Sequence, residues 1–295
     1  MNEIISYIVN TISLGGTYAL LAIGLAVVFS VLGLINFAHG DLMTLTGYFL
    51  LGGMFLNLPI WQAAAVAIVL AGISASIMEF FAFRPVRNSN PATLLMTSFA
   101  VSMLLQVLFQ NGISPRGKPV PLPGSLTDSI SIGDSQISKV QLLSIVTALV
   151  ALVLLRLFFS RSYWGWAIRA AADDFETVGL MGIKASRLIN LAFLISGLLA
   201  GIAGILWVAQ RGSVDPLMGF KPVLAAFIVV VIGGLGSLTG AVVGAFVLSG
   251  IEVGLQTWLP DSLMPYRDAL TYSLVIGVLM VFPNGLFGNK SNEKV

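Results

Sequence analysis

Long apolar stretches alternate with short polar ones along the whole chain. Several of them reach the length of about 20 residues that a helix needs to cross a hydrocarbon core about 30 Å thick. We therefore predict an all-α fold, a polytopic transmembrane helical bundle that forms a single domain over residues 1–295. The pattern indicates about eight hydrophobic segments, at residues 7–34, 38–56, 61–83, 92–111, 140–159, 188–210, 223–256 and 269–282.

The seventh segment is longer than one crossing requires, and its sequence is interrupted at residues 233–240, which read GGLGSLTG. The glycines in this stretch, together with a serine and a threonine, would interrupt a continuous helix. We expect two helices or half-helices that meet at a break formed by Gly233, Gly234, Gly236 and Gly240.

Positive charges in the short loops predict the orientation of the chain. The loops at residues 84–87 and 160–187 are rich in arginine and lysine, and such loops lie on the cytoplasmic side. The loop at residues 112–139 mixes both signs of charge with prolines, so we place it outside. The basic C-terminal tail returns to the inside only if the break in the seventh segment adds a turn.

Composition excludes a soluble globular protein. Hydrophobic residues make up 57% of the chain and charged residues only 9%, where a soluble domain has about 25% charged residues. The net charge of +2 gives no reason to expect a nucleic acid partner. The absence of cysteine excludes thiolate metal sites, thiol catalysis and disulfides. With a single histidine, no catalytic constellation is visible, so we expect neither an enzyme, nor a metal site, nor a cofactor.

One stretch imitates a nucleotide-binding motif. GISPRGK, at residues 112–118, matches the first seven positions of the phosphate-binding loop G-x-x-x-x-G-K-[ST]. The eighth position is Pro119, which lacks the hydroxyl that binds the metal, and no strand and helix flank the motif. We expect no nucleotide site here, so any ATP must be bound by another chain.

The most polar short motif lies between the first two apolar segments. GLINFAHGD, at residues 33–41, contains Asn36, the only histidine, His39, and the acid Asp41. The first interpretation is a helix start, with Asn36 accepting a backbone N–H as a cap. The second is that Asn36, His39 and Asp41 line a route through the membrane or move with it.

Two acidic residues lie at membrane depth. Ionisable groups there are costly and tend to face the bundle interior or a water-filled path, so Glu252 is either a pathway residue or a structural hydrogen-bonding group. Glu79 lies near the inner end of the third segment, close to Arg84, and we expect an interfacial ion pair between them.

The segment at residues 160–187 is longer than a connection between two spans needs. It reads as a short helix, alanine-rich at residues 167–172, followed by Asp173, Asp174 and Glu176 among apolar residues. A bare solvated loop would not need the apolar residues. A short amphipathic helix on the cytoplasmic side is suited to docking into a groove on a partner.

Motifs in a fixed order give the chain a resemblance to a known family. The chain resembles the permease subunits of the branched-chain amino acid ABC importers, the LIV family, and in particular the type that begins with INFAHG. The resemblance rests on GTYAL at 16–20, INFAHG at 35–40, RPVR at 84–87, the segment from Arg169 to Ile183, GGLGS at 233–237 with GA at 240–241, and Pro283 with Gly285 and Leu286.

The resemblance implies an importer in the bacterial inner (plasma) membrane that carries branched-chain or related amino acids. Its partners would be a second, unlike permease, two cytoplasmic ATP-binding subunits, a periplasmic substrate-binding protein and the lipid bilayer. The segment at 167–182 would be the helix that couples to the ATPases. Its coupling residues would be Arg169, Ala170, Ala171, Ala172, Asp174, Gly179 and Gly182.

The chain departs from the family pattern in two places. In the coupling segment, Arg169 precedes the alanines and no Leu-Pro closes the segment. Phe80 stands where many relatives have arginine.

Two alternative functions remain open. The importers of urea and short-chain amides share a motif like INFAHG. An ion-coupled secondary transporter, a different class, would use His39, Asp41 or Glu252 as a proton or sodium site. The substrate pathway residues that we predict from the sequence are Asn36, His39, Asp41 and Glu252.

Overall fold

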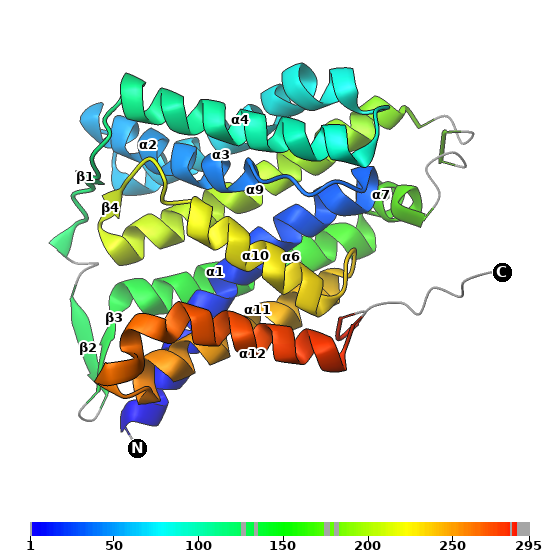
Figure 1. Cartoon of the computed structure of the whole chain (residues 1–295). Coiled ribbons are helices and arrows are strands. Elements are labelled where there is room, and N and C mark those ends of the chain that lie inside the picture. The colour runs from blue at the N-terminus through cyan, green and yellow to red at the C-terminus, as the bar shows by residue number, and fades with distance from the viewer. Residues whose placement is uncertain are drawn as a thin grey trace.

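The computed structural model describes residues 2–124, 128–132, 135–173, 178–179, 183–283 and 285–287. Within them, the chain forms a bundle of helices whose axes run mostly between two ends (Figure 1). The α-helices are α1 (Asn2–Leu32), α2 (His39–Phe55), α3 (Ile60–Met78), α4 (Pro91–Gly112), α6 (Lys139–Arg161), α7 (Tyr163–Asp173), α9 (Ala185–Arg211), α10 (Phe220–Gly233), α11 (Leu238–Trp258) and α12 (Arg267–Val281).

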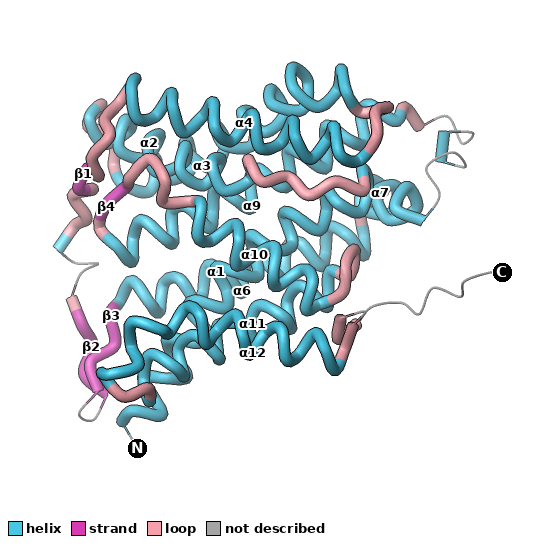
Figure 2. Tube along the Cα trace, viewed as in Figure 1, coloured by secondary structure: helices cyan, strands magenta, loops and turns pink. Residues whose placement is uncertain are grey.

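Short strands and turns complete the fold. The strands β1 (Lys118–Pro119) and β4 (Ser213–Val214) pair antiparallel, with Lys118 opposite Val214, and β2 (Ser129–Ile132) pairs antiparallel with β3 (Ser135–Ser138). Figure 2 shows that the strands lie at one end of the bundle, opposite α7. The chain also has a π-helical turn η1 (Glu79–Phe83) and the 3₁₀ turns η2 (Arg84–Val86) and η3 (Asp261–Tyr266).

The number of long spans differs from the prediction of about eight. The described residues contain six helices that are long and apolar enough to cross a membrane, namely Glu3–Leu32, Ile60–Val86, Pro91–Gly112, Lys139–Arg161, Ala185–Arg211 and Leu238–Trp258. Each predicted segment is helical, but α2, α10 and α12 have only 17, 14 and 15 residues. The predicted break also divides the seventh segment into α10 and α11.

Helix α1 forms the centre of the bundle, surrounded by α6, α9, α10 and α11 (Figure 1). In the most apolar 18-residue stretch of α1, 83% of the residues are buried, whereas the corresponding share is 22% in both α4 and α6. An all-round apolar helix such as α1 is therefore enclosed by protein. The exposed apolar side chains of α4 and α6, such as Met103 and Leu154, face lipid or another membrane helix.

Small residues allow a close contact between α3 and α9. Gly197 and Gly201, one helical turn apart on α9, face α3. A Cβ atom on Gly201 would lie 3.0 Å from the Cα of Ile68, and one on Gly197 would lie 2.7 Å from the carbonyl oxygen of Ala71. Membrane helices associate through such small-residue faces, which let two backbones approach closely.

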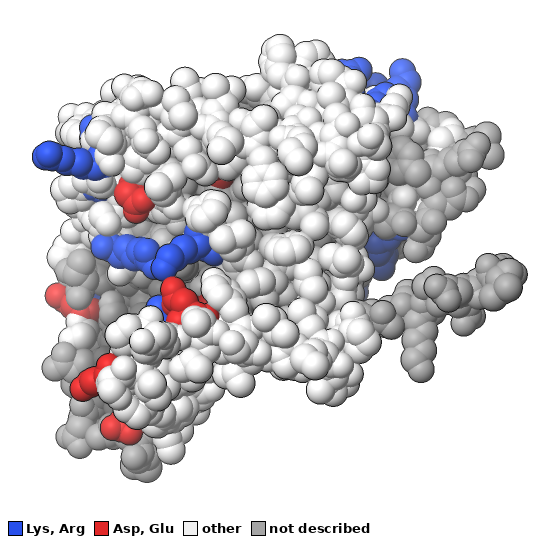
Figure 3. All heavy atoms as spheres, viewed as in Figure 1, with Lys and Arg blue, Asp and Glu red and all other residues white. Residues whose placement is uncertain are grey.

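The two arginine-rich loops lie at the same end of the bundle. We call the end that carries η2, α7 and the start of α9 the basic end. On the face shown in Figure 3, Lys and Arg side chains lie at both ends of the bundle, whereas the Asp and Glu side chains gather toward the end with the strands. The excess of positive charge is therefore on the side of the basic end, as is typical of cytoplasmic loops of membrane proteins.

Candidate functional site

Two helices begin in the interior of the bundle rather than at one of its ends. Helix α1 stops where Gly33 takes a positive φ of 65°, and the chain then runs back toward the interior before α2 begins at His39 (Figure 1). Helix α10 begins at Phe220, after a turn in which Asp215 Oδ1 accepts the N–H of Leu217 at 3.1 Å. Non-helical backbone at membrane depth is tolerated only where protein or a water-filled cavity surrounds it.

The starts of α2 and α10 touch. A Cβ atom on Gly219 would overlap the carbonyl oxygen of Gly40, and one on Gly40 would overlap the carbonyl oxygen of Gly219. The hydroxyl of Thr44 accepts the N–H of Gly219 at 3.1 Å and donates to the carbonyl of Gly40 at 3.4 Å. We call this contact, formed by Gly40, Thr44 and Gly219, the crossing.

The two helices leave the crossing in opposite directions. Helix α2 runs to the end with the strands, and α10 runs to the basic end (Figure 1). Two N-termini, each with the positive end of a helix dipole, therefore meet inside the bundle. Discontinuous helices related by inverted topology are the way in which many transporters build binding sites within the membrane.

Asn36 supports the start of α2 from the preceding turn. Its Oδ1 accepts the N–H of Ala38 at 3.1 Å, and its backbone carbonyl accepts the N–H of His39 at 3.2 Å. The N-cap position itself is occupied by Ala38. The side chain of Asn36 is only 1% exposed, and its Nδ2 has no hydrogen-bond partner among the described residues. An unused donor is thus held next to the crossing.

His39 lies in the core and joins three helices. Its Nδ1 is 3.0 Å from the hydroxyl oxygen of Ser196 on α9. Its ring fills the space left by Gly24 on α1, where a Cβ atom would lie 2.6 Å from the ring Cε1. The side chain has no exposed surface. The position suits a packing residue that fixes α2 against α1 and α9.

Asp41 lies on the other side of α2 and faces α4. Its Oδ1 accepts a hydrogen bond from Nε2 of Gln106 at 3.2 Å, and the same nitrogen donates to the hydroxyl of Ser102 at 3.0 Å. The carboxylate is 3% exposed, and within the described parts of the chain its Oδ2 has no partner. Asp41 therefore has an acceptor atom to spare.

An aromatic side chain connects α4 and α10 next to the polar residues. Phe37 stacks on Phe99 of α4 with ring centroids 4.3 Å apart, and its ring lies 5.9 Å from that of Phe227 on α10. These three residues and Gln106 were not among the site residues predicted from the sequence. The one available signal was the aromatic Phe37 within the polar motif.

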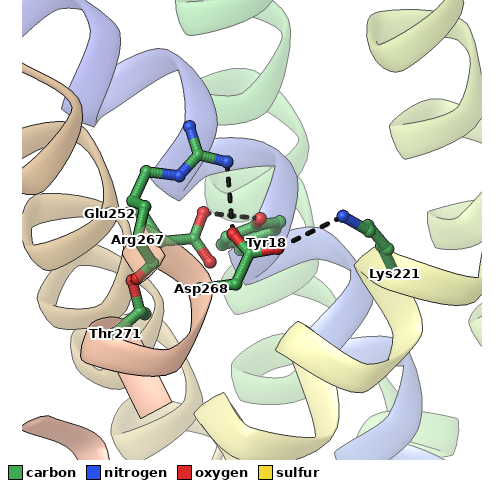
Figure 4. A network of polar contacts seen from close by, with 6 residues as sticks. All are labelled: Tyr18, Lys221, Glu252, Arg267, Asp268 and Thr271. Carbon is green, nitrogen blue, oxygen red and sulfur yellow. Dashed lines mark hydrogen bonds and ion pairs between the residues drawn. The ribbon is translucent and has the colours of Figure 1, made fainter. Parts of the chain in front are cut away.

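Glu252 belongs to a separate polar network, shown in Figure 4. Its Oε2 accepts a hydrogen bond of 2.9 Å from the hydroxyl of Tyr18 on α1. Beside it, Asp268 forms ion pairs of 3.3 Å with Lys221 and with Arg267. These partners could not be identified from the sequence, because they come from three helices other than α11, which carries Glu252. Lys221 is the second residue of α10 and closely follows Gly219 in the chain, so this network lies next to the crossing.

The predicted helix break is a tight hairpin at the basic end. Gly234 and Gly236 have positive φ values of 100° and 86°, which favour glycine. Gly233 and Gly240 pack backbone to backbone, so neither has space for a side chain. Ser237 caps α11 by accepting the N–H of Gly240 at 3.0 Å. The loop therefore reverses the chain between α10 and α11.

The C-terminal part of the chain covers this hairpin. The N–H of Leu286 donates to the carbonyl of Ile232 at 2.7 Å, and the N–H of Phe287 donates to that of Gly233 at 3.1 Å. Two carbonyl groups at the end of α10, which have no partner within the helix, are satisfied in this way.

The predicted coupling segment contains the short helix α7. Ala167, Ile168 and Ala171 are buried against the bundle, whereas Arg169 and Ala170 are exposed. The helix is thus amphipathic, with Ala171 on its inner face. Farther along the chain, Gly179 is exposed. Of the other predicted coupling residues, Asp174 and Gly182 lie outside the described residues, as does the side chain of Ala172.

The expected ion pair between Glu79 and Arg84 is wrong. Oε2 of Glu79 accepts a hydrogen bond from Nδ2 of Asn190 at 3.0 Å, and the guanidinium of Arg84 lies 5.1 Å from the centre of the Phe80 ring. The π-helical turn η1 directs Glu79 inward, where it is 2% exposed, while Arg84 stays at the surface.

The GISPRGK stretch does not have the surroundings of a phosphate-binding loop. Lys118 of the GISPRGK stretch lies in β1, and no helix begins after it at the position that a phosphate-binding loop requires. In the part of the chain that the structure describes, no group of three or more His, Cys, Asp or Glu side chains could hold a metal ion.

A multi-pass helical bundle in which two interrupted helices of opposite direction meet at buried polar groups is an arrangement found in many membrane transport proteins. Residues 7–283 match the model of the family described as branched-chain amino acid transport system, permease component. The chain belongs to this family of transport permeases, whose members are not enzymes.

Two of the relatives compared are similar over nearly their whole length, and a third is similar over about two thirds of its length. The chain is 34% identical to the high-affinity branched-chain amino acid transport system permease protein BraD of Pseudomonas aeruginosa, covering 100% of both chains. It is 33% identical to the permease protein LivH of Escherichia coli K12, covering 97% of this chain and 96% of LivH. It is also 25% identical to the permease protein LivM of the same organism, covering 84% of this chain and 68% of LivM.

Proposed function

We propose that this chain is a permease subunit of an ABC importer that carries branched-chain or related amino acids across the bacterial inner (plasma) membrane. The observation that carries the proposal is the match of residues 7–283 to the branched-chain amino acid permease family. The chain itself performs no chemistry and needs no cofactor, because ATP is bound by partner subunits.

The proposed partners are a second, unlike permease, two cytoplasmic ATP-binding subunits and a periplasmic substrate-binding protein. The similarity to both LivH and LivM, two permeases of one organism with the same system name, supports a pair of unlike permeases. The poorly buried helix α4 supplies apolar surface for such a contact.

The substrate route, in our proposal, passes the crossing on the side where Phe37 lies between α4 and α10. An amino acid carries a carboxylate and an ammonium group. The two helix N-termini and the unused donor of Asn36 suit the carboxylate, and the unused acceptor of Asp41 suits the ammonium. His39 has a positioning role, since its ring is enclosed by α1 and α9. Glu252 acts in the neighbouring network around Lys221, at the outer part of the same route.

The exposed face of α7 carries the proposed contact with the ATPases. Arg169 and Ala170 lie on this face. The buried face of α7 packs against α1, α6 and α9, so a force on the helix is passed to the bundle. The hairpin of Gly233, Gly234, Gly236 and Gly240 lies at the same end.

Uptake by the reconstituted importer tests the proposal. The chain is purified with its co-expressed partner subunits, placed in proteoliposomes and supplied with labelled leucine. We expect uptake that requires both ATP and the binding protein and that unlabelled isoleucine or valine inhibits. Uptake driven by an ion gradient without ATP would instead support a secondary transporter. Competition by urea but not by these amino acids would support the amide importers.

A further inference from the structure

A pocket of about 680 Å³ opens at the basic end, away from the crossing. Its walls are formed by the turns η1 and η2, by Trp164 of α7, and by the start of α9 with the residue before it. The proposed transport function uses none of the side chains that line it. The π-helical turn η1 is itself unusual, and such turns are frequent at functional sites.

A buried carboxylate forms one wall of the pocket. Glu79 is 2% exposed, and its Oε2 is held by Asn190. Its other oxygen, Oε1, has no hydrogen-bond partner among the described residues. A buried carboxylate oxygen without a partner is costly. The site therefore fits a ligand that brings an N–H donor, ideally one with positive charge.

Basic side chains form the rim. Arg84, Lys184 and Arg187 line the pocket and are exposed, and none of them takes part in an ion pair within the described ranges. Three cations beside one carboxylate suit a ligand that combines an anionic group with an ammonium group. Basic pockets between membrane helices on the cytoplasmic side are typical binding places for lipid head groups.

An apolar surface continues from the pocket along the bundle. Phe80, Leu191 and Leu194 are lining residues, and the neighbouring Phe81 is 72% exposed on the outer side of η1. Ile77, one turn earlier on α3, is exposed as well. Trp164 is a residue type enriched at the membrane interface. A ligand with a polar head at this pocket would thus have a path for acyl chains beside it.

We propose that this pocket binds the head group of a phospholipid with a primary ammonium, of the phosphatidylethanolamine type. The ammonium donates to Oε1 of Glu79, and the phosphodiester lies among Arg84, Lys184 and Arg187. The acyl chains follow the exposed side of η1 and α3. Phosphatidylcholine lacks the N–H donors, and phosphatidylglycerol offers hydroxyl donors without a positive charge, so neither can form a charge-assisted hydrogen bond with Glu79.

Native mass spectrometry of the delipidated full-length chain, with its co-purified subunits, tests this assignment. Dioleoyl phosphatidylethanolamine, phosphatidylcholine and phosphatidylglycerol are added separately. We expect the ethanolamine lipid to bind about tenfold more tightly than the choline lipid, which corresponds to one charge-assisted hydrogen bond. Equal binding of these two lipids would overturn the proposal.

Three variants locate the site. Glu79→Gln keeps an acceptor for Asn190 but turns the atom facing the pocket into a donor, so the preference for ethanolamine over choline should disappear. Arg187→Gln should weaken binding of both lipids. Arg156→Gln is the control. It removes an exposed charge of α6 that does not line the pocket, so it should change neither the affinity for the two lipids nor the preference between them. An unchanged preference in Glu79→Gln would contradict the proposal.

A series of head groups makes the test independent of any variant. With the unaltered protein, mono- and dimethylated phosphatidylethanolamine should still bind, because each retains an N–H donor. Affinity should fall at the third methylation, which removes the last one. A smooth decline with head-group size, or displacement of the lipid by free leucine, would overturn the assignment.

Discussion

Thr44 and Gly219 are joined by a hydrogen bond of 3.1 Å, although 175 positions separate them in the chain. The bond closes the contact at which α2 and α10 begin. Because Gly40 and Gly219 touch there through their backbones, this part of the bundle has no space for even one additional methyl group.

The substitution Gly219→Ala should therefore lower both the stability and the transport activity of the importer. Gly219→Ala forces the starts of α2 and α10 apart, and overpacking of this kind costs about 1–3 kcal/mol. We expect a lower unfolding temperature of the purified complex and a loss of uptake. Gly52→Ala, on α2, is the control, since a Cβ atom there meets nothing within 4 Å. Normal stability in Gly219→Ala would show that the two helix starts are not packed as described.

His39 and Asp41 should give different kinds of defect. His39→Ala removes the ring that fills the space beside Gly24 and leaves the hydroxyl of Ser196 without its partner, at a cost of about 1–3 kcal/mol. We expect less assembled complex but a normal uptake rate for each complex that assembles. Quantitative immunoblotting with uptake of labelled leucine separates the two quantities. A reduced rate per assembled complex would instead place His39 on the route.

Asp41→Asn should show the opposite behaviour. Asparagine retains an oxygen that can accept the hydrogen bond from Gln106, so the contact with α4 survives. The charge that we assign to the substrate ammonium is lost, and we expect a rate per complex about tenfold lower, equivalent to one charge-assisted hydrogen bond. Asn36→Ala, which removes the other unused group, should also lower the rate. Unchanged uptake in Asp41→Asn would remove this residue from the route.

Neighbouring alanines of α7 should distinguish docking from packing. Ala170 is exposed, so Ala170→Asp should leave the chain stable in the membrane while ATPase subunits no longer co-purify with it. Ala171 is buried, and Ala171→Asp places a carboxylate against the bundle at a cost of about 2 kcal/mol or more. The second variant should therefore be degraded or poorly assembled. Pull-down of the ATPases by Ala170→Asp at the normal level would contradict the docking role of this face.

The sequence predicts which segments are helical, but it does not predict at what depth in the bundle each helix begins. Apolar runs and the glycines at 233–240 locate every segment and the break, because both signals are local. That α2 and α10 start inside the bundle depends on the contact between Gly40 and Gly219, which are distant in the chain. A hydrophobicity pattern gives no information on such a contact.

The candidate site was predictable only in part. Asn36, His39 and Asp41 could be selected as polar residues in an apolar context, but their separate roles depend on which helix each one faces. Likewise, the inward position of Glu79 results from the π-helical turn η1, which no pattern in the sequence indicated. The inward orientation of Ala171 became known only from the packing of α7 against α1, α6 and α9.

The hydrogen bonds from Leu286 and Phe287 attach the C-terminal segment to the last residues of α10. With 14 residues, α10 is a rod about 21 Å long, and its far end lies at the crossing. If Leu286 and Phe287 are displaced at the basic end, either these two backbone hydrogen bonds break or the whole of α10 moves with them. Helix α10 thus connects the basic end, where we propose that the ATPases bind, with the crossing, where the residue before its first turn rests against Gly40.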